Sequence, residues 1–147
     1  MYLMRRKYVK NWEHTPKERQ FKVHGKAMIG QEIINLSDLS YLEFEAIYWR
    51  KANAIHKWFV DNVQKGEDDC RSYGVDVDDL ENLLLTVDVC LANKKECHKL
   101  LPLLDGPFFG SREYDEYYFE ELERTRDEIN ILLRNYPDDE YTYESSW

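Results

Sequence analysis

Apolar side chains recur at helical spacing in three stretches of the chain. Spacings of three, four and seven residues place such side chains on one face of an α-helix. The first stretch begins with Ser40-Tyr41-Leu42-Glu43, which has the form of a capping box, and Gly66 lies just beyond its end. The last stretch alternates by four and three up to Pro137. The pattern therefore predicts three principal helices, near residues 41–64, 77–92 and 114–135.

Shorter alternating stretches near the N-terminus predict β structure. Phe21 to His24 and Ala27 to Ile29 flank a His-Gly pair, a spacing that is typical of a hairpin. We therefore expect a mainly α fold of the α+β class, with three principal helices packed against a small N-terminal β-hairpin. The chain should form one domain in three consecutive parts: a β-rich part at 1–36, a helical body at 37–136 and an acidic tail at 137–147, which is loose or adds a short strand.

The composition is that of a globular protein. A chain of 147 residues, 43% apolar and 33% charged, can bury a core as one domain. No apolar run approaches the roughly 18 residues that span a bilayer, and the N-terminus lacks the apolar segment of a signal peptide. We therefore expect a cytoplasmic protein that does not bind membranes. Cys70, Cys90 and Cys97 form no C-x-x-C pair, so we expect them to be reduced and mostly buried.

The net charge of −9 is unevenly distributed along the chain. Residues 1–26 hold eight Lys or Arg and two Glu, a net charge of +6, which leaves −15 for the remainder. So acidic a remainder repels nucleic acid at long range, and nucleic-acid binding would have to rely on the N-terminal part. Nucleic acid is therefore not an expected partner.

The segment WRKANAIHKWFVDNV carries the densest set of aromatic and polar side chains. On a helix, Trp49, Asn53 and His56 share one stripe. Arg50 and Lys57 form the adjacent stripe together with Asn53. The two stripes merge into a patch of indole, amide, imidazole, guanidinium and ammonium groups. Such a patch could hold an anion, with a tryptophan ring as the stacking platform for a base.

The same segment has a simpler interpretation. Trp49 could pack in the core while Asn53 and His56 satisfy buried backbone groups, and the basic residues could pair with acids elsewhere. A helix through the whole segment also sets the two tryptophans apart. Trp49 and Trp58 are nine positions apart, about 180° around the helix, so one should be buried and the other at least partly accessible.

Acidic residues offer few signs of catalysis. His56, Asp68, Asp69 and Asp115 could in principle coordinate a cation. Their spacing is not diagnostic of any metal, and acids are common at helix N-termini because of the helix dipole. We therefore expect no metal and no cofactor. The sequence also lacks a Gly-rich phosphate loop, G-x-S-x-G and His-Glu-x-x-His. The sequence therefore favours a binding protein over an enzyme, and enzymatic activity is left open as the alternative.

A further acidic row is expected in the last predicted helix. Glu120, Glu123 and Asp127 share one helical face, as metal-binding carboxylates would. Arg124 and Arg126 are interleaved with them, and no matching set occurs on another helix. This row is therefore interpreted as a solvent-exposed charged face.

Three segments resemble a family of small, mostly uncharacterised proteins carried by bacteriophages and prophages. They are WRKANAIHKWFVDNV with Asp68-Asp69-Cys70, the loop from Leu100-Leu101-Pro102 to Phe108-Phe109-Gly110, and Glu113 to Phe119. The resemblance covers roughly residues 41–122, and the loop departs from the family at Asp105-Gly106-Pro107, where members have a longer apolar-aromatic stretch. It implies a phage origin, and hence the host cytoplasm, but no particular activity.

The leading hypothesis is a noncatalytic, phage-encoded binding protein that holds an anionic, nucleotide-like small molecule, as in sequestration of a host immune signal. Its candidate ligand-binding residues are Trp49, Arg50, Asn53, His56, Lys57, Phe108, Phe109, Tyr114 and Asp115. One alternative is an acidic inhibitor of a host defence protein. Another is a small metal-dependent hydrolase that uses Asp68, Asp69, His56 and Asp115. Self-association into a homo-oligomer is left open.

Overall fold

A computed structural model describes residues 1–104 and 113–146 of the chain. Contacts between residues divide it into two compact units. The first, which we call the body, comprises Met1–Arg5 and Glu45–Trp147, and the second, the inserted unit, comprises Arg6–Phe44.

A four-stranded sheet has the order β4-β1-β6-β5. Its strands are β1 (Tyr2–Tyr8), β4 (Tyr41–Tyr48), β5 (Tyr73–Val75) and β6 (Glu140–Glu144). The last two pair antiparallel, with Tyr73 opposite Tyr143 and Val75 opposite Tyr141. Because side chains alternate across a strand, Tyr141 and Tyr143 both point into the core. The expected acidic tail therefore contains a central strand of the sheet.

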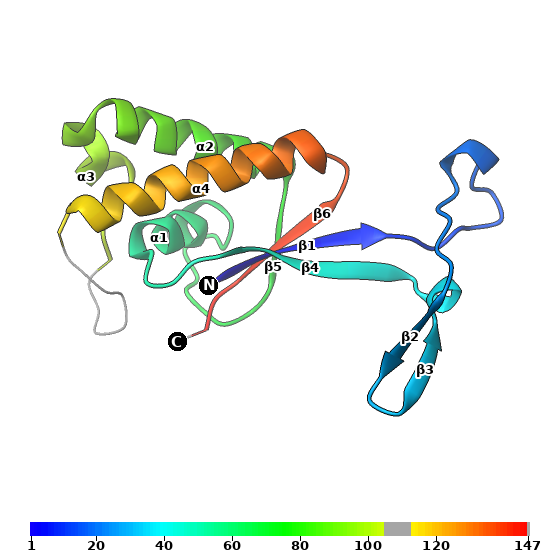
Figure 1. Cartoon of the computed structure of the whole chain (residues 1–147). Helices are drawn as coiled ribbons and strands as arrows, with labels where there is room; N and C mark the ends of the chain where they lie inside the picture. The colour runs from blue at the N-terminus through cyan, green and yellow to red at the C-terminus, as the bar shows by residue number, and fades with distance from the viewer. Residues whose placement is uncertain (105–112, 147) are drawn as a thin grey trace. The chain divides into compact units, whose positions relative to one another are not determined.

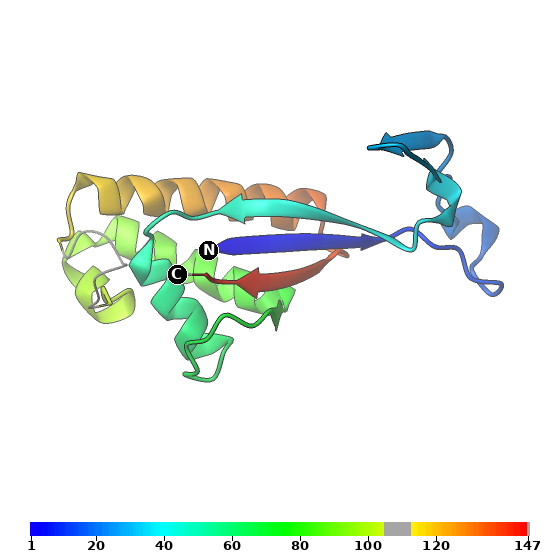
Figure 2. The ribbon, with the colours of Figure 1, turned by 90° about the horizontal axis from the view of Figure 1, so that it is seen from below.

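The helices of the body are α1 (Asn53–Asn62), α2 (Val77–Ala92), the short α3 (Cys97–Leu100) and α4 (Glu116–Asn135). α2 begins at a capping box formed by Asp76 and Asp79. α2 also packs along α4 (Figure 1). Seen from below, the strands lie in front of these two helices, which cover one face of the sheet (Figure 2).

The core of the body lies between these helices and the sheet. Leu80, Leu83 and Val87 of α2 are fully buried, as the apolar spacing predicts, and Leu122 and Ile129 of α4 are buried with them. Burying a side chain of this size stabilises the fold by about 1.5–3 kcal/mol. Cys90 and Cys97 are free and buried, whereas Cys70 is free and exposed. None of the described helices is long and apolar enough to cross a membrane.

The inserted unit contains a two-stranded hairpin, β2 (Lys26–Ile29) with β3 (Glu32–Asn35). Gly30 turns the chain between the strands with φ of +62°, a conformation that favours glycine. The hairpin thus lies further along the chain than the His-Gly turn expected from the sequence. Within the inserted unit, which is described throughout, Val9 is the one buried hydrophobic residue.

The expected mainly α fold with three principal helices is wrong. The described residues form an α+β fold with four helices, a four-stranded sheet and a two-stranded sheet. Residues 41–48 form β4 instead of the first half of a helix. This stretch, YLEFEAIY, alternates apolar and polar residues with period two and is rich in aromatic residues, so it suits a sheet better than its capping-box start suggests. The helices expected near 77–92 and 114–135 are confirmed by α2 and α4.

Candidate functional site

Trp49, the first of the candidate ligand-binding residues, lies before α1 and not on it. Lys51 adopts a left-handed backbone conformation with φ of 61°, which separates β4 from the helix. The Trp49 indole nitrogen donates to Thr125 Oγ1 of α4 over 2.9 Å, and the ring is fully buried. Trp58 is also buried, with 7% of its surface exposed. The expected difference between the two tryptophans is therefore wrong, because they do not share one helix.

His56 lies at the centre of a buried polar network. Its Nδ1 lies 2.7 Å from the Tyr143 hydroxyl, and its Nε2 lies 3.1 Å from Asp68 Oδ1. A carboxylate only accepts, so the proton belongs on Nε2 and Nδ1 accepts from Tyr143. Burial lowers the pKa of His56, and the nearby charge of Asp68 opposes part of that effect. The Tyr143 ring stacks on Phe59 with centroids 4.0 Å apart. The imidazole therefore joins α1, β6 and the loop after α1.

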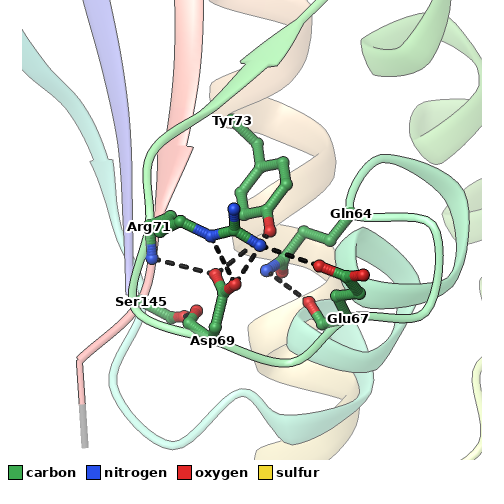
Figure 3. Close-up of polar contacts among 6 residues, drawn as sticks. All are labelled: Gln64, Glu67, Asp69, Arg71, Tyr73 and Ser145. Atoms are coloured by element: carbon green, nitrogen blue, oxygen red, sulfur yellow. Dashed lines mark hydrogen bonds and ion pairs between the residues drawn. The ribbon is translucent and has the colours of Figure 1, made fainter.

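The loop after α1 is held by a second polar cluster, shown in Figure 3. The Asp69 carboxylate accepts from the backbone N–H and Nε of Arg71, over 3.0 and 2.6 Å, and from the Tyr73 hydroxyl. The hydrogen bond from the Arg71 backbone is the main cause of the lowered pKa of Asp69. Ser145 Oγ donates to the Asp69 carbonyl oxygen, which ties the loop to the residue after β6. These bonds fix the loop that carries Asp68 to His56.

The basic residues of the expected anion patch do not converge on one point. Lys57 Nζ forms an exposed ion pair with Asp61 over 2.7 Å. Arg50 is exposed, and its carbonyl oxygen accepts from the Tyr117 hydroxyl over 3.2 Å. Asn53, in contrast, is buried with 3% of its surface exposed. The indole, amide and imidazole thus lie in the core, while the cations lie at the surface.

The remaining candidate ligand residues lie near the start of α4. Asp115 is its N-cap residue and accepts from the Tyr118 backbone N–H over 3.0 Å. The exposed Tyr114 accepts from the Leu103 backbone N–H at 3.4 Å. Phe108 and Phe109 lie outside the described residues.

A small pocket of about 30 Å³ opens beside the starts of α1 and α4. Among the described residues of its lining, Asn53 and Asp115 are candidate ligand residues. Its charged lining residues are Lys51, Glu113, Asp115 and Glu121. With three carboxylates against one ammonium group, the described wall of this pocket disfavours an anion.

The candidate metal ligands are not gathered in one place. His56 and Asp68 are in contact, but Asp69 is bonded to Arg71 and Asp115 caps α4. Among the residues that the structure describes, no group of three or more His, Cys, Asp or Glu side chains is placed to hold a metal ion.

An exposed face of α2 combines apolar and acidic side chains, which no chemical motif in the sequence marks. Leu85 and Val89 lie one turn apart and are 63% and 43% exposed. Glu81 lies one turn before Leu85, and Asp88 lies between the two apolar residues on the same side, both exposed. The helix has four carboxylates and not one Lys or Arg. The helical spacing of the sequence indicates this exposed apolar face, because Leu85 and Val89 lie off the stripe of buried leucines.

A second group of exposed acids lies on α4, which packs along α2. Glu120, Glu123 and Asp127 are exposed, as expected from the sequence. Arg126 has a raised pKa, first because of its hydrogen bond to Asp127. Asp88 of α2 adds to that effect through its charge, so Asp88 lies close enough to Arg126 of α4 to interact with it. The acids of α2 and the acidic row of α4 therefore approach each other at Arg126.

Comparisons with known proteins add no identification. No family model, no curated protein and no solved structure matches this chain.

Proposed function

We propose that this chain is a noncatalytic protein-binding module that engages a basic surface of another protein through the exposed face of α2. The observation that carries this proposal is the exposure of Leu85 and Val89 on a helix with four carboxylates and no positive charge. An apolar centre with a charged rim is the usual anatomy of a protein interface.

The two parts of this face would contribute differently to binding. Covering Leu85 removes a largely exposed aliphatic side chain from water, and full burial of such a side chain is worth about 1.5–3 kcal/mol. Glu81 and Asp88 would speed association with a basic partner and exclude acidic ones. The acidic row of α4 would widen the area over which the partner is attracted.

The hypothesis of an anionic small ligand has less support from the geometry. Trp49 and His56 are buried and bonded within the protein, and Lys57 is paired with Asp61. The pocket beside α1 is lined by more carboxylates than cations. A metal-dependent hydrolase has less support still, because Asp69 and Asp115 are bonded elsewhere and do not join the pair of His56 and Asp68. The described surface favours the acidic inhibitor among the three hypotheses.

The resemblance to phage-encoded proteins supports a more specific form of the proposal. In a phage protein of the host cytoplasm, the partner would be a basic host protein, such as a defence factor whose nucleic-acid-binding surface is positive. The acidic face of α2 and α4 would occupy that surface as a mimic of nucleic acid.

Photo-cross-linking in bacterial cells that produce the full chain tests this proposal. A photoreactive residue is placed at position 85, and at position 100 as a control, because Leu100 is an exposed leucine of α3 with 41% of its surface accessible. We expect one discrete protein adduct at position 85, and its loss when Asp88→Lys is added. Equal adducts at both positions, or none at position 85, would contradict the proposal.

A further inference from the structure

The inserted unit contains an open groove of about 480 Å³. The side chains in its lining that bear on a ligand are Lys10, Lys22, His24 and Phe21, and no carboxylate belongs to the lining. The groove lies entirely within the inserted unit, whose residues are all described. It therefore presents positive charge beside an aromatic ring, which the acidic α2 face does not.

Hydrogen bonds within the inserted unit give this groove a defined wall. The Asn11 amide donates to the Phe21 carbonyl oxygen over 2.7 Å and accepts from the Phe21 backbone N–H over 2.8 Å. Thr15 Oγ1 accepts from the Trp12 backbone N–H over 2.9 Å, and Gln20 donates to the Thr15 carbonyl oxygen. The chain from residue 11 to residue 21 is thus closed into a loop, which fixes where Trp12 and Phe21 emerge.

Both of these aromatic rings are accessible and have a cation beside them. Trp12 is 50% exposed, with Lys10 Nζ 5.2 Å from the centroid of its ring. Phe21 is 43% exposed, with Lys7 Nζ 5.5 Å from its centroid. An accessible ring can stack on a nucleic-acid base, and an adjacent ammonium group can contact the phosphate that joins that base to the next.

The charge of the whole chain does not decide what this groove can bind. Residues 6–26 hold seven Lys or Arg and two Glu, a net charge of +5. Exposed charges further apart than a Debye length, about 8 Å at physiological ionic strength, are largely screened from each other. The expectation against nucleic acid rests on the net charge of −15 in residues 27–147, whereas the charges that line the groove act on its ligand directly.

We propose that this groove binds single-stranded nucleic acid, with one base stacked on Phe21 of the lining and the backbone held by Lys10 and Lys22. A second base would stack on the exposed Trp12 ring, which lies beside Lys10 but outside the lining. A single strand fits better than a duplex, because stacking on a side chain requires a base that is free of its own stack. The site lies in a different unit from the α2 face, so it goes beyond the proposed function and can fail independently of it.

Fluorescence anisotropy with the full chain and labelled twelve-nucleotide oligothymidine tests the proposal. We expect saturable binding at 50 mM salt that weakens as salt is added. Lys10→Ala and Lys22→Ala should each reduce the slope of log affinity against log salt by about 0.7, the value for one phosphate contact to a single strand. Lys99→Ala is the matched control, because Lys99 lies on α3 and pairs with Glu96, and it should leave the slope unchanged.

Variants of the aromatic residues separate stacking from simple charge attraction. Phe21→Leu keeps an apolar side chain of similar size without a ring face, and Trp12→Phe keeps a ring. We expect Phe21→Leu to weaken binding about 5- to 150-fold, the range for loss of one stacked base, and Trp12→Phe to retain most of the affinity. Melting temperatures confirm that each variant is folded.

Several outcomes would overturn this inference. One is no binding at 50 mM salt when the protein is in up to 100-fold excess over labelled oligothymidine. The others are equal affinity for an abasic strand of the same length, equal affinity for a duplex, and unchanged affinity in folded Phe21→Leu. Equal affinity for the abasic strand would mean that the groove attracts polyanions without stacking. None of these outcomes bears on adduct formation at position 85.

Discussion

The Tyr143 hydroxyl donates a hydrogen bond to Nδ1 of His56, although the two residues are 87 positions apart in the chain. Because Asp68 accepts from the other ring nitrogen, both nitrogens of a fully buried imidazole are satisfied. The bond joins α1 to β6, a strand from the last residues of the chain. The network therefore explains a polar group in the core without requiring a ligand.

Tyr143→Phe removes that donor while keeping the ring that stacks on Phe59. The substitution leaves His56 Nδ1 buried without its donor, so we expect the free energy of unfolding to fall by about 1–3 kcal/mol. Urea denaturation measures the change. Tyr48→Phe is the control, since Tyr48 is exposed at the end of β4, and it should change stability by less than about 0.5 kcal/mol. Equal effects of the two substitutions would show that the network contributes nothing to stability.

Stability should also depend on pH through His56. Burial lowers its pKa below the ordinary value of 6.5, against the opposing charge of Asp68. Below pH 6.5 the unfolded chain therefore binds a proton that the folded protein still excludes, so stability that is complete above pH 6.5 is lost as the pH falls through the folded pKa. We expect the loss of unfolding free energy between pH 7.5 and pH 5 to be smaller in His56→Gln. Parallel pH profiles for the two proteins would contradict this assignment.

Sequence patterns predicted the parts of the fold that depend on local periodicity. The buried stripe of Leu80, Leu83 and Val87 repeats at helical spacing, so α2 was recognisable, and α4 was recognisable for the same reason. Residues 41–48 were misassigned, because an alternating stretch behind a capping-box sequence allows both a helix and a strand. Pairing in the sheet decides between them, and that pairing is non-local.

The candidate site was harder to predict than the helices. Helical spacing predicts one patch of Trp49, Asn53 and His56 only if a continuous helix runs through all three residues. The left-handed conformation of Lys51 breaks that helix, and the partners of the buried side chains come from distant segments. Sequence spacing cannot place Thr125 against Trp49, or Tyr143 against His56.

Asp115 offers a test of whether a candidate ligand residue is structural. Its side chain caps α4 by accepting from the Tyr118 backbone N–H. Asp115→Ala should therefore lower the free energy of unfolding by about 0.5–2 kcal/mol, whereas Asp115→Asn, which can still cap, should lose much less. Thermal denaturation of the two variants gives the comparison. If the two variants were equally destabilised, the carboxylate would contribute through its charge and not through the cap.

The central claim is tested most directly by binding measurements with the protein captured at position 85. Its affinity for the full chain is compared between the Leu85→Asp and Leu100→Asp variants. The claim places Leu85 at the centre of the interface, and losing the burial of such a side chain costs about 1.5–3 kcal/mol, roughly 10- to 150-fold in affinity. Both leucines are exposed, so neither substitution should alter the melting temperature greatly. We predict at least a tenfold loss of affinity for Leu85→Asp and less than a twofold change for Leu100→Asp. Unchanged affinity in a folded Leu85→Asp variant, or an equal loss in both variants, would contradict the proposed protein-binding face.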